Sequence, residues 1–179
     1  MSLLYVQEAF NLFVGDDGPN NSKHLNLTSL KLPTLEEKSQ DHFAGGAIGE
    51  VAIGGLGLSK LEVSFKIAGH DPQIMSQFGL GTRWNMPYTI YGLVRDKTGG
   101  APVELKSVIQ GRLAKIEGDE MRRGELMGHD HMIHEVLRYQ LWFNQKEKYY
   151  YDFLTSEWRV DGVPQNADAR NILRIPGGG

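Results

Sequence analysis

Three histidines lie close together in the second half of the chain, at His129, His131 and His134, and Asp130 stands between the first two. Imidazole and carboxylate groups suit zinc and similar ions, so this segment could hold a metal. In a strand, however, side chains alternate between two faces, and His134 would point away from the face that His129 and His131 share. We expect a polar segment that leads into a strand, and we keep a His-dependent metalloprotein as a secondary alternative.

Two other segments carry residue types that could do chemistry. Carboxylates at positions 117, 119, 120 and 125 could act as a pair, but Arg122 and Arg123 stand among them, which favours a solvated loop that neutralises its own charge. The glycine-rich stretch 45–57 lacks the Gly-Lys-Ser/Thr ending of a phosphate-binding loop. Neither segment predicts an active site.

Three consecutive tyrosines, Tyr149, Tyr150 and Tyr151, could stack on the bases of a single-stranded nucleic acid. In a strand, Tyr149 and Tyr151 would face one way and Tyr150 the other. Packing in the core and at an interface is therefore the expected role of these rings.

The composition excludes several classes of function. The formal net charge is −3, with a pI near 6.1, so the chain has no general attraction for nucleic acid. The absence of cysteine excludes disulfides and cysteine-based sites. No sequence marks a nucleophile elbow. We predict a protein with no cofactor and no catalytic activity.

No segment reads as a signal peptide or a membrane span. The first residues lack a basic region, and polar side chains follow too soon for a signal peptide. The longest mostly apolar stretch, residues 44–61, is rich in glycine and contains Glu50 and Lys60. We expect no membrane insertion of the subunit itself.

Strict alternation makes residues 59–67 the clearest strand, with Leu61, Val63, Phe65 and Ile67 on one face. This pattern is typical of a strand with one face on a core and the other in water. Further strands are expected, and a phase slip at positions 28–29 predicts a β-bulge in the second of them. Their ranges are residues 3–14, 24–32, 87–95, 103–116, 133–143, 149–154 and 158–160.

One short helix is expected directly after the clearest strand. Asp71 suits the N-cap and Pro72 the first helical position, while Ile74, Met75 and Phe78 form an apolar side. In the long strand 133–143, strict alternation would place Ile133, Glu135, Leu137 and Tyr139 on one face. The sum predicts a mainly β fold, an antiparallel barrel or sandwich with one short helix.

Residues 1–176 are predicted to form a single domain. Residues 33–56 are small, polar and rich in glycine, which predicts an irregular arm that projects from the body. Residues 177–179, all glycine, are expected to be a disordered tail.

Several short motifs follow one another in an order that resembles the major tail tube protein of P2-like contractile phages, a family related to the tubes of R-type bacteriocins. They cover residues 25 to 175. The motifs are Leu30-Lys31-Leu32-Pro33-Thr34-Leu35, Ala44-Gly45-Gly46-Ala47, Leu61-Glu62-Val63-Ser64-Phe65 followed by Gly69 and Asp71, Gly111-Arg112-Leu113-Ala114-Lys115-Ile116-Glu117, and Val160-Asp161-Gly162-Val163 followed by Arg170-Asn171-Ile172-Leu173.

The resemblance implies a structural subunit of the inner tail tube. Subunits would form a six-fold homo-hexamer ring with a continuous inner β-barrel, and rings would stack into a channel through which DNA passes without specific binding. The implied partners are the tail sheath protein, the baseplate, the tail terminator and the tape-measure protein. The implied location is the virion tail, assembled in the host bacterial cytoplasm. A phage tail, an R-type bacteriocin and another injection device all remain open.

Two sets of residues follow from this resemblance. A channel wall would be polar on its wet face, and the residues expected to face the lumen are Lys60, Glu62, Ser64, Lys66, Glu104, Lys106, Gln110 and Arg112. The arm is expected to form the contact between stacked rings, through Leu35, Glu36, Lys38, Phe43, Gly45, Gly46 and Ile48. The alternative from another class is a small β-barrel that binds a ligand in an apolar pocket.

Overall fold

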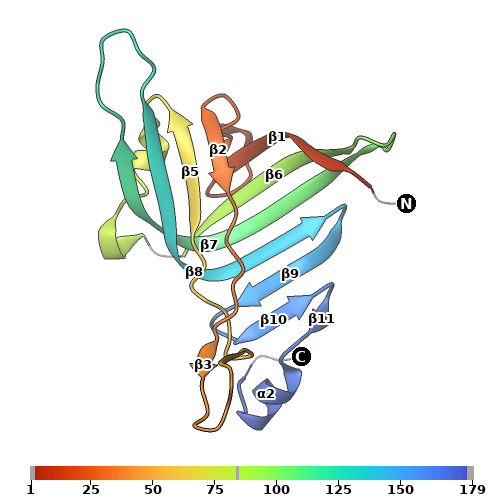
Figure 1. The fold of residues 1–179 in the computed structure, drawn as a ribbon. Coiled ribbons are helices and arrows are strands. Elements are labelled where there is room, and N and C mark those ends of the chain that lie inside the picture. Colours follow the sequence, from red (N-terminus) through yellow and green to blue (C-terminus); the bar gives the residue numbers. More distant parts are fainter. Residues whose placement is uncertain (1–2, 84, 177–179) are drawn as a thin grey trace.

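The computed structural model describes residues 3–83 and 85–176, and the predicted tail 177–179 lies outside the described residues. The chain is mainly β, as predicted, and its main sheet is antiparallel. The strands of this sheet run in the order β1-β6-β7-β8-β9-β10-β11, and β2 joins through β5, which pairs with β8 (Figure 1). Their bounds are β1 Tyr5–Val14, β2 Leu27–Lys31, β5 Val63–Ala68, β6 Met86–Asp96, β7 Pro102–Gly118, β8 Gly128–Phe143, β9 Lys146–Asp152, β10 Glu157–Val160 and β11 Val163–Pro164.

The sheet forks along β8. The first half of β8 pairs with β5, and its second half pairs with β9, while β7 runs along its other side. At the fork, Gln110 of β7 lies opposite Arg138 and Arg112 lies opposite His134, so two steps of β7 match four of β8. The extra residues form a bulge with Glu135 at a φ of 50°.

This bulge interrupts the predicted alternation of β8. Ile133 and Tyr139 are buried on one face as predicted, but between them Val136 is buried and Glu135 is exposed. Two inserted residues leave the strands on either side in phase, so only the residues within the bulge depart from the predicted pattern. The strand also begins at Gly128, earlier than predicted, so the histidine segment belongs to the sheet.

The core lies on the inner face of the curled sheet. Leu12, Tyr88, Ile109 and Ile133 are all fully buried there, and β5 adds the alternating residues that its sequence predicted. The strand containing them begins at Val63, four residues later than expected. In β2 the register shifts between Leu27 and Ser29, which confirms the predicted bulge.

The predicted helix is present as α1, Pro72–Met75, and Asp71 caps it by accepting a hydrogen bond from the Ile74 N–H at 3.1 Å. Only Ile74 is buried. Met75 and Phe78 are 50% and 43% exposed. The prediction that they form an apolar side together with Ile74 is therefore wrong, and it holds for Ile74 alone. The helix ends after a single turn, before a wider apolar face can form.

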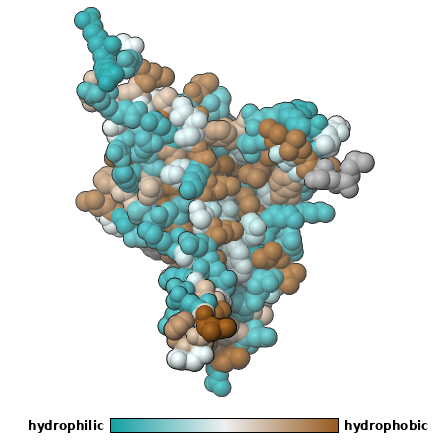
Figure 2. Space-filling view, in the orientation of Figure 1, coloured by the Kyte–Doolittle hydropathy of each residue, from teal (hydrophilic) through white to brown (hydrophobic). Residues whose placement is uncertain are grey.

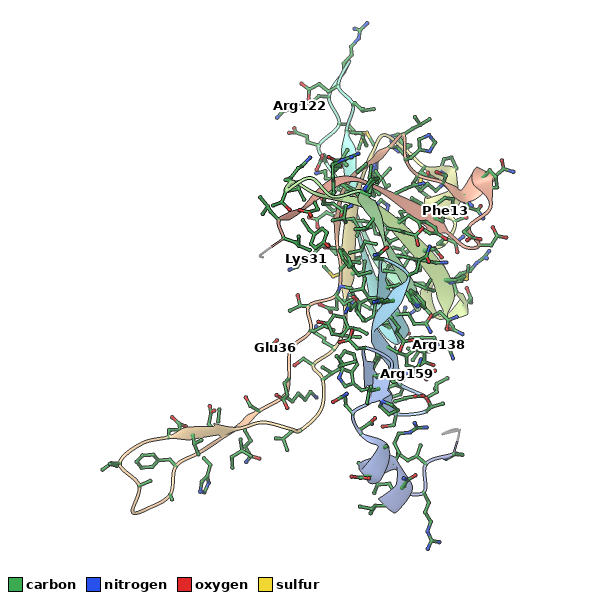
Figure 3. All side chains as sticks on the ribbon, turned by 90° about the vertical axis from the view of Figure 1, so that its right-hand side faces the viewer. Phe13, Lys31, Glu36, Arg122, Arg138 and Arg159 are labelled. Atoms are coloured by element: carbon green, nitrogen blue, oxygen red, sulfur yellow. The ribbon has the colours of Figure 1, made fainter. Side chains whose placement is uncertain are left out.

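Residues 33–56 leave the body as a long hairpin, the arm (Figure 3). The arm is more regular than predicted, because β3 (Gln40–His42) and β4 (Val51–Ile53) pair along it. At its base, Ser59 N–H donates to the Glu36 carbonyl at 2.8 Å, and Lys38 N–H to the Gly57 carbonyl at 2.7 Å.

A second helix, α2 (Ala167–Ile172), follows β11 and was not predicted. Asn166 precedes it, and Asp168 lies in its first turn, a pattern that favours a helix start. Among the described residues, neither helix has the length or apolar content needed to cross a membrane.

Candidate assembly surfaces

The outer face of β5, β7 and β8, opposite the core, carries most of the side chains predicted to line a channel. We call it the charged face. On β5, Ser64 and Lys66 alternate with buried neighbours, and on β7 the even-numbered residues from Glu104 to Arg112 do the same. Ser64 and Lys66 lie near the fork of the sheet together with Arg112. Glu104 and Lys106 lie toward the other end of β7.

Lys66 is the centre of one ionic cluster on the charged face. Its Nζ lies 3.1 Å from the Asp119 carboxylate and 3.3 Å from that of Asp130, which is its partner across β5 and β8. Hydrogen bonds to Asp119 and then Asp130 raise the pKa of Lys66, and the bond from Lys66 lowers the pKa of Asp119. Both shifts favour the charged forms of Lys66 and Asp119.

Arg112 forms the most directional pair on this face. Its Nε and Nη2 donate to the two oxygens of Glu135 at 2.9 and 2.6 Å, and its Nη1 donates to the Leu80 carbonyl at 3.2 Å. This fork geometry holds the guanidinium flat against the bulge. The hydrogen bond from Arg112 lowers the pKa of Glu135.

Glu62 and Lys60 lie just before β5 and form an exposed pair 2.8 Å apart, and His134 Nε2 lies 3.4 Å from the same carboxylate oxygen. The Lys60 side chain is 82% exposed. Lys60 lies outside any strand, although the predicted strand 59–67 included it. The hydrogen bond from Lys60 lowers the pKa of Glu62.

The remaining predicted channel residues lie along β6 and β7. Lys106 Nζ is 5.2 Å from the ring centre of Tyr91 and 6.0 Å from that of Trp142, on the two neighbouring strands. Glu104 is exposed and Gln110 is half-buried. The charged face therefore mixes both signs with aromatic rings along its whole length.

All seven residues predicted to join rings lie in the arm, and six of them are exposed: Glu36, Lys38, Phe43, Gly45, Gly46 and Ile48. Leu35 differs, because it packs half-buried against the core at the base of the arm. Apolar side chains without cover continue along β4, where Val51 and Ile53 are 57% and 49% exposed. Brown, hydrophobic atoms mark the end of the arm in Figure 2.

The outer edge of β1 is a further surface of this kind. The sheet begins at β1, whose residues from Tyr5 to Phe10 pair only with β6 within the described part of the chain, whereas the Leu12 carbonyl accepts from the Lys23 N–H at 2.9 Å. Val6 and Phe10 on this strand are 38% and 37% exposed. An unpaired strand edge with apolar side chains is a template for pairing with another chain.

The histidines do not form a metal centre. His131 is buried and stacks on Phe65 with ring centres 4.8 Å apart, while His129 contacts the Gly69 carbonyl through Nδ1 at 3.0 Å. His134 lies on the opposite face, beside Glu62, as the alternation predicted. Across residues 3–83 and 85–176, no three histidine or carboxylate side chains converge in a metal-binding arrangement.

The tyrosines divide as expected for a strand. Tyr149 and Tyr151 pack against the core, and Tyr149 also stacks on Trp158 at 5.7 Å. Tyr150 lies on the other face, where the guanidinium of Arg159 lies 3.7 Å from its ring centre. The loop carboxylates are also ion-paired as predicted, for example Glu120 with Arg122 at 3.1 Å.

A second ionic cluster, between β9, β10 and α2, was not predicted. Arg159 lies between Glu147 and Glu157, and Arg170 reaches the cluster from α2. The sequence could not have shown this cluster, because strict alternation places Glu147 on the face of Tyr149 and Tyr151. A register shift between β8 and β9 moves Glu147 to the face of Tyr150, where Arg159 lies. Arg159 is labelled in Figure 3, where it lies on the sheet above α2.

A sequence model of one protein family, described as phage tail tube protein FII, matches residues 8–173. The chain belongs to this family. Its tail tube proteins are structural, so this protein is a structural subunit of a tail tube and a component of the virion tail. The sequences of curated proteins give no match.

Solved structures of contractile injection systems share the fold of this tail tube subunit. A chain of the PVC extracellular contractile injection system, in its extended sheath–tube complex, superposes with a TM-score of 0.52 at 9% identity, over 75% of this chain and 88% of that one. A chain of the PVC sheath/tube terminator in the extended state gives a TM-score of 0.51 at 10% identity, over 75% and 93%. At these identities the likeness shows the fold alone.

Proposed function

We propose that this tail tube subunit assembles into stacked hexameric rings that form the inner tube of a contractile injection machine. One observation carries the proposal. The main sheet begins at β1 and ends at β11, and the outer edges of both strands have no partner strand in residues 3–83 and 85–176. A sheet left open at both ends can continue through a neighbouring copy, and a ring closes every edge at once.

In the proposed ring, the outer edge of β1 pairs with a strand of the next subunit. Backbone hydrogen bonds would supply the adhesion, and burial of Val6 and Phe10 would add to it. Six-fold closure into a continuous inner β-barrel follows the resemblance to contractile tail tubes.

The charged face is the proposed wall of the channel. Its cations are largely matched by carboxylates, as in the pairs Lys66–Asp130 and Arg112–Glu135. Such a wall neutralises few phosphates, so DNA could pass without the salt-dependent hold that a cationic wall would exert.

The arm is the proposed contact between rings. Its apolar side chains have no cover within their own copy, and a hairpin on the next ring's surface would gain the burial that it lacks here. The arm and its acceptor are different surfaces, so the contact is heterologous and can repeat without limit along a tube.

The proposed partners are the sheath, the baseplate, the tail terminator and the tape-measure protein. The similar chains come from complexes with a sheath and with a sheath/tube terminator, which supports the first and third of these. We also propose that the subunit is not catalytic and that it assembles in the cytoplasm of a bacterial host.

The ring proposal is tested by imaging purified protein in negative stain, beside the double variant Val6→Lys with Phe10→Lys. We expect rings or tubes from the natural chain and isolated subunits from the variant, since lysine blocks edge pairing. The control places lysines at Phe153 and Leu154, two exposed apolar residues (62% and 69%) that lie in the turn after β9 and away from the edge of β1. Natural protein that stays monomeric at high concentration refutes the proposal.

A further inference from the structure

A pocket of about 660 Å³ lies beside α2, on the face of β9 and β10 that carries the second ionic cluster. Four charged side chains line it: Glu147, Glu157, Arg159 and Arg170. The formal charges cancel, but the hydrogen bonds are distributed unequally between the two arginines.

Arg159 takes most of the available acceptors. Its Nε and Nη2 donate to the two oxygens of Glu147 at 3.0 and 2.9 Å, and its Nη1 donates to Glu157 at 2.9 Å. Three of the four carboxylate oxygens in the pocket are therefore directed at this one guanidinium.

Arg170 is left poorly satisfied. Its side chain is 8% exposed, and its closest carboxylate oxygen, on Glu157, lies 3.7 Å from Nη1. Its Nε and Nη2 are buried and find no acceptor among the described residues. A buried charge without hydrogen bonds is strongly unfavourable, so a missing acceptor has to come from elsewhere.

The unsatisfied atoms identify the chemistry of that acceptor. Nε and Nη2 form one edge of the guanidinium, and two parallel N–H groups on that edge match the two oxygens of a carboxylate. Arg170 lines the pocket, but this edge is buried, so the side chain has to rotate to present it to an incoming group. Glu147 and Glu157 repel any anion, and they oppose a doubly charged phosphate more strongly than a singly charged carboxylate.

The arm offers such a carboxylate. Residues 40–53 contain Asp41 and Glu50 and neither lysine nor arginine, so the hairpin is acidic. Asp41 lies within β3, opposite Ala52, whereas Glu50 stands in the exposed loop at the far end. The arm runs away from the body and does not fold back over α2 of its own copy (Figure 3).

We infer that Glu50 of one copy enters the pocket beside α2 of another copy. There its carboxylate accepts hydrogen bonds from Nε and Nη2 of Arg170 in a bidentate ion pair. This inference rests on the proposed stacking of rings and names the acceptor for the arm. It explains why a tube subunit keeps a buried arginine incompletely bonded when it is alone: the site is finished only by assembly.

The test measures the critical concentration for polymerisation of the full chain by sedimentation. Glu50→Gln is expected to raise it about tenfold, which is the effect of one charge-assisted hydrogen-bonded pair. Asp41→Asn, which removes the same charge from the same hairpin, is expected to change it less than about twofold. Both positions are exposed, so neither variant should alter the melting temperature.

Arg170→Lys keeps the positive charge but loses the two parallel N–H donors of the guanidinium. We expect it to weaken polymerisation as much as Glu50→Gln does. The double variant should be no weaker than either single one, because both remove the same contact. Additive effects, or a larger effect of Asp41→Asn, would overturn the inference. A chain without residues 177–179 should stack normally, and a loss of stacking in this variant would overturn the inference too.

Cross-linking gives a readout that does not depend on affinity. The chain has no cysteine, so Gly49→Cys with Asn171→Cys should form a disulfide ladder between copies in oxidised tubes. Gly49→Cys with Asp168→Cys, on α2 but outside the pocket lining, should not. A ladder from the second pair alone contradicts the inference, whereas natural protein that never polymerises contradicts the tube proposal itself.

Discussion

The Lys23 ammonium lies 2.9 Å from the Asp71 carboxylate, and both side chains are nearly buried, at 6% and 10% exposure. Lys23 also donates to Gln73 at 2.6 Å, and Asp71 accepts from Asn26 at 3.1 Å. This network joins the segment before β2 to α1, so one ion pair fixes the helix that covers the core.

Replacing Lys23 by Met should lower the free energy of unfolding by about 3 kcal/mol, because Asp71 would be left charged without its partner. Chemical denaturation measures this directly. The matched control is Lys60→Met, which breaks an ion pair of similar length at the surface and should change stability by about 0.5 kcal/mol or less. Equal effects of the two variants would show that the buried pair has no special role.

Asp71 also predicts how stability depends on acid. Burial alone would raise its pKa, but the hydrogen bonds from Lys23, Ile74 and Asn26 outweigh burial, and the pKa is lowered. A carboxyl with a lowered folded pKa stabilises the protein above its unfolded pKa, which is about 3.9, and this stability is lost as pH falls toward the folded pKa. Asp71→Asn should therefore flatten the acid limb of a plot of stability against pH, and an unchanged limb would contradict this.

Gly111→Ala should destabilise the protein by about 2 kcal/mol or more, because overpacking forces the backbone to move. A Cβ at Gly111 would lie 2.8 Å from Ile133 Cγ2 and 3.0 Å from the His134 carbonyl oxygen, within the bulge of β8. Gly81→Ala is the control, since a Cβ there meets no atom within 4 Å. Thermal unfolding compares them, and an equal melting temperature would show that the fork of the sheet yields easily.

Reversing charge on the proposed channel wall should slow DNA passage while leaving the tube intact. Glu62→Arg with Glu104→Arg adds cations along β5 and β7, and the added phosphate contacts should hold DNA more tightly at low salt. Particles assembled with this variant should show reduced infectivity. Glu120→Arg with Glu125→Arg, in the loop between β7 and β8, makes the same charge change off the wall. Unchanged infectivity of the wall variant would refute the assignment of the charged face to the lumen.

The sequence predicted the regular strands well because a strand with one wet face shows its pattern directly. The alternation around Phe65 placed β5, and the strands predicted at residues 87–95 and 103–116 are β6 and β7. The mainly β fold followed from such segments, whereas the family followed from the resemblance of short motifs. The phase slip at Thr28 was visible because leucines on both sides recorded the change of face.

Features that depend on contacts between distant residues were not predictable. The bulge of β8 exists because Gly111 on another strand leaves room for it. Arg170 and Glu157 meet only because α2 lies beside β10, and a single sequence carries no record of that contact. The pairing of β3 with β4 was hidden by small residues that lack a core-facing pattern.

The most direct test of the account is a cryo-EM reconstruction of tubes assembled from the natural chain. The account predicts six-fold rings in which the outer edge of β1 hydrogen-bonds to the next subunit, Lys66 and Arg112 face the channel, and the arm lies on the adjacent ring. A reconstruction in which β1 stays unpaired between subunits, or in which the charged face points away from the channel, would contradict it.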